Sequence, residues 1–419
     1  MDVLLLLMGG NPLPNYITAD YTLKSHRVDQ DDLPSPGKII FVSTDKTENF
    51  FQSILNLLKK RHQSLFFQSE ETKLGSDHRS PDFIRKKIIN VLKKNPGIDS
   101  IHLNYTGGTK PMAVNAVIAV SEFAREKDIK LIMSDLDPDN FKLISYRVNP
   151  NGKMGEKKCF PGKGDLRDAV HLNIDEIFEL HDMKPVPIKK QDYILENGII
   201  DIITFSQEIA LDYRKSTRRK RFVEIYKSLA GNNLGDRKKI ISAHPYLKGI
   251  YDENFKLKVT PGQFYAFICG KWLEDYLYLS LKKIEPELNI AFTEIRKNVE
   301  AKYDERPCEI DVVVVKGFRM FLFSCTTSQK IKLVKQKAFE ALFRAEQLGG
   351  EHAKVIIVST MFNTPCIPGK IKFSRKSNLE ELGRDVKQFN ADQKCELIGL
   401  DELTDVTAFE NRLKHIFQK

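Results

Sequence analysis

Three acidic side chains in the last third of the chain have the spacing of a catalytic or metal-binding group. Glu309 and Asp311 lie two residues apart in a run rich in β-branched residues, so both side chains point to one face of a predicted strand. Asp311 precedes four consecutive valines, and burying a carboxylate there is costly unless a cation or several donors meet it. Glu274 lies in a predicted helix that is otherwise largely apolar. Such carboxylates could bind a divalent cation. Glu274 could also be ordinary helix-surface charge, although its position next to Trp272 and Leu273 predicts partial burial.

A second candidate site is the sequence Thr106-Gly107-Gly108-Thr109-Lys110, which follows a predicted strand and opens a helix. The glycines let backbone N–H groups approach an anion, the helix N-terminus adds partial positive charge, and Lys110 adds a full one. The loop has neither the Gly-x4-Gly-Lys spacing of a P-loop nor the GxGxxG of a dinucleotide site. It could bind phosphate, or it could be an ordinary turn with Thr109 as the helix N-cap.

Residues 1–150 are predicted to form a Rossmann-like α/β domain, because short apolar runs alternate with amphipathic stretches. In such sheets ligands bind beyond the carboxyl ends of the strands, so the loops holding Asn11, Thr44 and Thr106 are expected to meet at one edge. The predicted strands are Val3–Met8, Lys38–Thr44, Ser64–Gln68, Ile101–Tyr105, Leu131–Ser134 and Phe141–Val148, with helices at Glu48–Lys60, Pro81–Lys94 and Met112–Glu126.

Residues 151–255 are predicted to connect this domain to a second α/β domain at residues 256–419. The connecting part contains a predicted helix at Asn173–Leu180, a strand at Ile199–Phe205, and the basic run Arg214–Arg221, which could touch phosphates or form a solvated surface. The last part is predicted to contain helices at Phe264–Lys283, Leu333–Leu348 and Glu402–Phe417, and strands at Ile290–Arg296, Glu309–Val315, Met320–Thr326 and Lys354–Ser359.

Length and composition agree with two or three globular domains. The chain has 419 residues, 41% hydrophobic and 29% charged, which excludes a disordered chain or a membrane bundle. A net charge of +10 favours anionic partners. The six cysteines form no CxxC pair, so neither a zinc site nor a disulfide framework is indicated. No apolar run is long enough for a signal peptide or a membrane span, and we expect a cytoplasmic protein.

The sequence Asn104-Tyr-Thr-Gly-Gly-Thr-Lys-Pro-Met112 resembles the signature of CARF domains, the CRISPR-associated Rossmann-fold sensors. The resemblance implies a homodimer whose paired edges bind a cyclic oligoadenylate made by a type III CRISPR complex, most simply cyclic tetraadenylate. It implies that the ligand contacts come from Asn11, Thr44, Thr106, Gly107, Gly108, Thr109 and Lys110.

The C-terminal part resembles the PD-(D/E)xK nuclease superfamily. The stretch Gly270–Tyr276 looks like the first nuclease helix, and Glu309-Ile-Asp-Val312 looks like the metal-binding strand. The order of a CARF domain, a connector and a restriction-endonuclease-like α/β domain resembles the CARF-fused CRISPR ancillary nucleases of antiviral defence. This implies that Asp311, Glu274 and the carbonyl of Cys325 hold Mg²⁺ or Mn²⁺, and that DNA, RNA or both are cleaved.

One motif departs from the superfamily, because Ser324-Cys325-Thr326 stands where Glu-x-Lys is expected. If the enzyme is active, Glu309 or Glu274 replaces the missing carboxylate and a lysine from the next segment replaces the missing amine. If it is not, the chain is a catalytically impaired sensor that regulates nucleic-acid or protein binding. A third hypothesis is that Lys110 and Thr109 cleave the cyclic ligand at the sensor itself. The lysines considered for the nuclease site are Lys330, Lys332 and Lys335.

Overall fold

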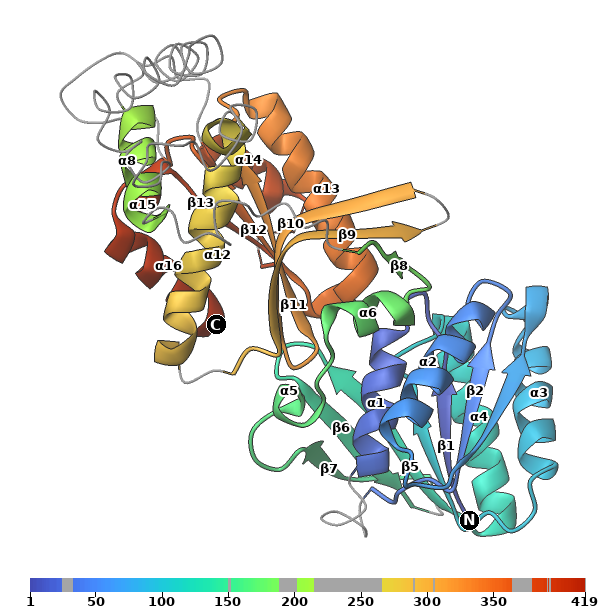
Figure 1. The fold of residues 1–419 in the computed structure, drawn as a ribbon. Helices are drawn as coiled ribbons and strands as arrows, with labels where there is room; N and C mark the ends of the chain where they lie inside the picture. The colour runs from blue at the N-terminus through green and yellow to red at the C-terminus, as the bar shows by residue number, and fades with distance from the viewer. Residues whose placement is uncertain are drawn as a thin grey trace.

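The computed structural model describes residues 1–24, 33–149, 152–187, 202–214, 266–288, 291–303, 306–363, 379–389, 391 and 393–418. The chain forms two α/β halves, each built on its own sheet, that meet along one side (Figure 1). Within these described residues no helix is long and apolar enough to cross a membrane.

The first sheet has the strand order β3-β2-β1-β4-β5-β6-β7. Strands β1 to β5 are parallel, whereas β6 and β7 are antiparallel additions. Helices α1 and α2 pack on one face, and α3 and α4 pack on the other. The predicted Rossmann-like fold is confirmed. The elements are β1 (Asp2–Leu7), α1 (Leu13–Lys24), β2 (Lys38–Ser43), α2 (Glu48–Arg61), β3 (Gln68–Lys73), α3 (Pro81–Lys93), β4 (Ser100–Asn104), α4 (Lys110–Lys127), β5 (Lys130–Asp137), β6 (Lys142–Val148) and β7 (Met154–Phe160).

The structure departs from the prediction at three places in this half. The strand predicted at Ser64–Gln68 is wrong except at its last residue: the strand is β3 (Gln68–Lys73), a polar segment that pairs with β2 at the edge of the sheet, and Phe66 is 89% exposed. Helix α1 was missed because it is buried on nearly every side, including Asn15 and Asp20, and therefore has no amphipathic pattern. The sheet also continues past residue 150, since β7 pairs with β6.

The second sheet has the order β13-β12-β11-β10-β9-β8. Helices α8, α12 and α16 share a core with one face, and α13 and α14 cover the other. The elements are β8 (Lys184–Pro185), α8 (Ile202–Arg214), α12 (Trp272–Ile284), β9 (Glu294–Tyr303), β10 (Arg306–Lys316), β11 (Arg319–Thr326), α13 (Ile331–Gly349), β12 (Lys354–Ser359), α14 (Leu379–Gln388), β13 (Cys395–Ile398), α15 (Leu400–Leu403) and α16 (Val406–Gln418).

The strand predicted at Ile199–Phe205 is wrong from residue 202 onward, where α8 begins. Ile202 and Ile209 are buried in the core shared with α12, so the apolar positions serve a helix face. The helix predicted at Asn173–Leu180 is confirmed as α6 (Ile174–Leu180), with Asn173 as its N-cap in a capping box. Of the basic run, the part from residue 215 to 221 lies outside the described residues.

The two halves share a hydrophobic core. Residues of β1, α1 and α2 belong to the same buried cluster as residues of β10, β11 and α13. At the tip of the β10–β11 hairpin, Leu172 N–H donates to the Gly317 carbonyl at 2.8 Å, and Phe318 lies with its ring 6.2 Å from that of Phe141. Gly317 has a φ of +64°, and a side chain there would collide with the backbone of Arg167. The hairpin tip is therefore seated on α5 (Leu166–Ala169) and the segment that follows it.

Candidate functional site

The loops after β1 and β4 meet at the carboxyl edge of the first sheet, as predicted. A Cβ atom on Gly9 would lie 3.0 Å from the Gly108 nitrogen, and one on Gly107 would overlap the Leu7 carbonyl oxygen. Gly108 has a φ of +78°, which favours glycine. The two glycines of the Thr106–Lys110 loop are thus required by close backbone packing, whatever the loop binds.

The threonine side chains of that loop are hydrogen-bonded within the protein, whereas Lys110 is exposed. Thr106 Oγ1 accepts a hydrogen bond from Leu136 N–H at 2.8 Å. Thr109 is the N-cap of α4, accepting from Met112 N–H at 3.4 Å, so the capping role considered for it is confirmed. Lys110 is exposed and makes no ion pair with any residue that the structure describes. A cationic side chain at a helix N-terminus is therefore available to an anion.

Asn11 and Thr44 are already engaged within the protein. Thr44 is 7% exposed, and its hydroxyl lies 3.3 Å from that of Thr47. Asn11 Oδ1 accepts from Leu13 N–H at 2.9 Å and lies 3.2 Å from His181 Nε2. Both belong to loops at the expected edge, but their side chains contact neighbouring elements of the protein.

Asp311 lies at a position of strand β10 that has no ladder partner on either neighbouring strand. Pairing with β11 runs only from Val312 toward the hairpin tip, and pairing with β9 skips the position of Asp311. Asn298, which would face it on β9, has a φ of +50°. Asp311 Oδ2 instead accepts from the Cys325 N–H at 2.6 Å. Because the ladder is interrupted, the Asp311 carboxylate lies beside backbone groups that are not paired between strands.

The charge of Asp311 acts on Glu274. Burial, with the charge of Asp311 next in importance, raises the pKa of Glu274 to about 8. Burial likewise raises the pKa of Asp311, against the opposing effect of Lys337. Two partly buried carboxyl groups with raised pKa values mark a site where a further cation would be favourable.

Lys337 of α13 is the lysine that the structure brings to Asp311, and the sequence analysis missed it. Its ammonium group donates to the Cys325 carbonyl at 3.0 Å and lies 3.8 Å from Asp311 Oδ2. The available signal was helical periodicity, because Lys337 lies beside Val334 and Ala338, the buried positions of α13.

The lysines considered from sequence lie elsewhere. Lys335 pairs with Glu381 and Asp385 of α14, at 2.7 and 2.9 Å. Lys330 and Lys332 are exposed at the start of α13, and among the described residues neither forms an ion pair with Asp311. Glu309 is exposed as well, whereas Glu274 is half-buried.

The donor set fits a divalent cation only with help from the backbone. No three His, Cys, Asp or Glu side chains in the described part of the chain are grouped to hold a metal. The Cys325 thiol lies in the core, and burial raises its pKa well above the usual value, so its backbone carbonyl, which accepts from Lys337, is the group of Cys325 that could bind a cation. Oxygen atoms of Asp311, Glu274 and the Cys325 carbonyl are the ligand type that Mg²⁺ and Mn²⁺ take.

We expect the raised pKa of Glu274 to show in stability. Between its ordinary pKa of 4.5 and about 8, folded Glu274 keeps a proton that the unfolded chain releases, so the free energy of unfolding falls as pH rises through this window. Glu274→Gln should raise the metal-free unfolding free energy above pH 8 by on the order of 2 kcal/mol, discounted for partial exposure, and change it little near pH 4. Denaturant titrations across this range test it, with the exposed Glu309→Gln as control. Parallel pH profiles for all three proteins would contradict it.

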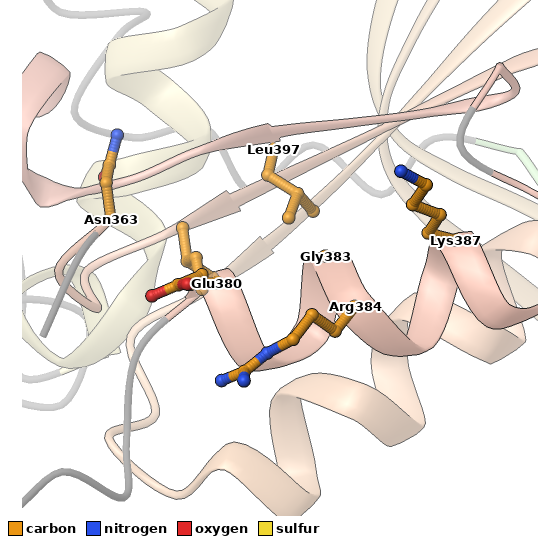
Figure 2. A pocket seen from close by; sticks show the side chains of 7 residues that line it. Asn363, Glu380, Gly383, Arg384, Lys387 and Leu397 are labelled. Carbon is orange, nitrogen blue, oxygen red and sulfur yellow. The ribbon is translucent and has the colours of Figure 1, made fainter.

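A cavity of about 340 Å³ lies between α14 and β13, away from Asp311 (Figure 2). Its floor is apolar, with Leu397 of β13 facing α14, and charged side chains of α14 stand around it. None of the candidate site residues lines it. The lining residues are Asn363, Leu379, Glu380, Gly383, Arg384, Lys387 and Leu397.

Comparisons with known proteins agree with the two-sheet architecture. Residues 24–149 match the family model of the Card1 CARF domain. The whole chain is similar to the crystal structure of protein VC1899 from Vibrio cholerae, with a TM-score of 0.63, 15% identity, and coverage of 100% of this chain and 98% of that one. It is also similar to Can2 from Sulfobacillus thermosulfidooxidans, solved with cyclic tetra-adenylate, with a TM-score of 0.59, 16% identity, and coverage of 99% and 98%. No curated protein matches the sequence. At these identities the likeness concerns the fold.

Proposed function

We propose that the chain is a cyclic-oligoadenylate-activated, metal-dependent nuclease of type III CRISPR antiviral defence, working as a cytoplasmic homodimer on DNA, RNA or both. Residues 1–150 would be the CARF sensor, 151–255 the connector and 256–419 the nuclease-like domain. The observation that carries the proposal is that Asp311, the Cys325 backbone and Lys337 come together at the break in the β10 ladders, with Glu274 near enough for the charge of Asp311 to help raise its pKa.

The sensor assignment rests on the loop edge of the first sheet. The match to the Card1 CARF domain at residues 24–149 includes the loops with Thr44 and Thr106, though not the loop after β1, and the similar Can2 structure holds cyclic tetra-adenylate. In this chain the exposed Lys110 and the N-terminus of α4 face solvent at that edge. They supply the positive charge that a ring of phosphates needs, and an isologous dimer would present each loop twice to a two-fold symmetric ring.

The chemistry of the nuclease site follows from the charges of its residues. A bound Mg²⁺ or Mn²⁺ would supply a Lewis acid for a phosphoryl oxygen and lower the pKa of a bound water. Asp311 and Glu274 would hold that cation through carboxylate oxygens. Lys337 would donate to an oxygen of the scissile phosphate, replacing the lysine that is missing from Ser324-Cys325-Thr326.

The proposal is tested by incubating the full chain with Mn²⁺, each cyclic oligoadenylate, and supercoiled DNA, single-stranded DNA or RNA. We expect cleavage that depends on both the metal and a ring, with the tetraadenylate most effective. Absence of ring-dependent cleavage from every combination would reject the nuclease, and absence of ring binding would reject the sensor. Opening of the ring to a linear oligoadenylate would instead support cleavage at Lys110 and Thr109.

One observation favours a catalytically impaired sensor as the second candidate. Lys337 already donates to the Cys325 carbonyl and neutralises Asp311, two of the groups that a metal would need. In that case the ring would still bind and would alter nucleic-acid or protein binding, without cleavage. Calorimetry with Mn²⁺ separates the two, since the impaired sensor predicts no metal binding at Asp311.

We expect Lys110→Ala to weaken cyclic tetraadenylate binding about 10-fold, because a charge-assisted hydrogen bond to phosphate is lost. The affinity should also depend less steeply on salt. Isothermal titration at two ionic strengths measures both effects. Lys127→Ala, at the other end of α4, is the charge-matched control and should leave the affinity unchanged. Equal affinities for all three proteins would show that Lys110 does not contribute to ligand binding.

A further inference from the structure

Helix α13 joins the two candidate sites. Near its beginning it carries Lys337, and after Gly349 it ends in the turn Gly350–His352, which we call the corner. Lys337 and Gly350 are 13 residues apart, or about 20 Å along a helix axis. In Figure 1, α13 runs along the second sheet to the junction with the N-terminal half.

The corner packs against loops at the carboxyl edge of the first sheet. A Cβ atom on Gly350 would lie 2.5 Å from Asn11 Nδ2, in the loop after β1. Asn11 cannot easily move aside, because its Oδ1 accepts from Leu13 N–H and His181 lies against it. The loop after β5 makes a second contact, since the His352 ring lies 5.7 Å from the Phe141 ring. Two edge loops therefore touch one end of α13.

The other half of the nuclease site is anchored elsewhere. Asp311 and Cys325 belong to the β10–β11 hairpin, whose tip is seated on Arg167 and Leu172 through Gly317. Lys337 and Asp311 thus belong to different elements that touch where they meet the N-terminal half, because Arg319 Nε donates to the His352 carbonyl at 3.1 Å and the Phe318 and His352 rings lie 5.7 Å apart. A movement of the edge loops that shifts the corner relative to the hairpin tip would change the Lys337 to Asp311 distance, now 3.8 Å.

We propose that Asn11 and Gly350 are positioning residues for Lys337: they transmit occupancy of the ligand edge through α13 to the nuclease site. The assignment rests on the proposed function. It gives Asn11 a coupling role in place of the ligand contact expected from the sequence. Coupling energies between sites are typically 1–3 kcal/mol, or 5- to 150-fold, which a single contact of this kind can alter measurably.

The test variant is Gly350→Ala, which adds one methyl group against Asn11 at a φ of +57°. Gly97→Ala is the matched control, because Gly97 has a φ of +74° with nothing within 4 Å, so it carries the backbone strain without the contact. Asn11→Ala removes the contact from the opposite side without adding atoms. Each protein is measured for cyclic tetraadenylate affinity, for the ratio of cleavage with and without the ring, and for thermal stability.

We expect Gly350→Ala and Asn11→Ala to bind the ring within about 3-fold of the unchanged protein and to lose its stimulation about 10-fold or more. Gly97→Ala should keep full stimulation. Hydrogen exchange gives a readout that needs no cleavage: the ring should change protection at residues 346–352 in the unchanged protein and not in Asn11→Ala. Full stimulation of both contact variants overturns the coupling and leaves the proposed function standing. Failure of the unchanged protein to bind the ring overturns both.

Discussion

Asp311→Asn is expected to reduce metal-dependent cleavage at least about 100-fold, the largest effect of any single change in this protein. The amide keeps the acceptor for Cys325 N–H but loses the charge that would hold the cation. Burial already raises the pKa of this carboxyl group, so the protein should not lose stability when the charge is removed. Cleavage of plasmid and single-stranded substrates with Mn²⁺ and cyclic tetraadenylate measures the loss.

Asp128→Asn is the control for this prediction. Asp128 has left-handed backbone angles at the C-cap of α4, a conformation that asparagine also adopts, and it lies in the other half of the molecule. Ring affinity should be the same in both variants, because neither touches the ligand edge. Cleavage by Asp311→Asn at the unchanged rate would show that the acid-lined break in β10 is not the nuclease site.

Lys337→Met should lower cleavage about 10- to 100-fold, because the ammonium group is the one cation that the described residues place on both Asp311 and the Cys325 carbonyl. Its loss should also raise the pKa of Glu274 and of Asp311 further, since its charge lowers both. Cleavage should then need a higher pH, so a pH profile of the residual activity distinguishes this role from a merely structural one.

The opposite result would be equally informative. If Lys337→Met binds Mn²⁺ more tightly and cleaves faster, the ammonium group occupies the cation position and restrains the site. A loss on Lys332→Met with none on Lys337→Met would return the role to the lysines expected from the sequence. Lys59→Met, on the exposed surface of α2, is the charge control.

The sequence predicted the elements that have strong apolar patterns and failed where burial or pairing hides them. Val3–Met8 and Lys354–Ser359 are continuous apolar runs and were assigned correctly as strands β1 and β12. Polar β3 is a strand only because it pairs with β2, and α1 is buried on nearly every side. Neither the pairing of β3 nor the burial of α1 can be predicted from local composition.

In the candidate site, too, the sequence identified one residue from its local pattern and missed another that depends on tertiary packing. The spacing of Glu309 and Asp311 placed both on one strand, but only the interruption of both ladders distinguishes the buried Asp311 from the exposed Glu309. Lys337 depends on how α13 crosses the sheet, so tertiary packing and not spacing selects it over Lys330 and Lys332. The sequence analysis predicted that a lysine from another segment would replace the missing one, but it did not identify Lys337.

The buried cluster that runs from β1 through α2 to β10 and α13 makes the two halves interdependent for folding. Cutting the chain after residue 150 would remove β7 from the first sheet and separate α6 from α2, which would expose part of the core around Phe178. The N-terminal half therefore depends on the second half for part of its core. Attaching the N-terminal half to another protein would therefore require including the β10–β11 hairpin tip and the corner, which pack against it.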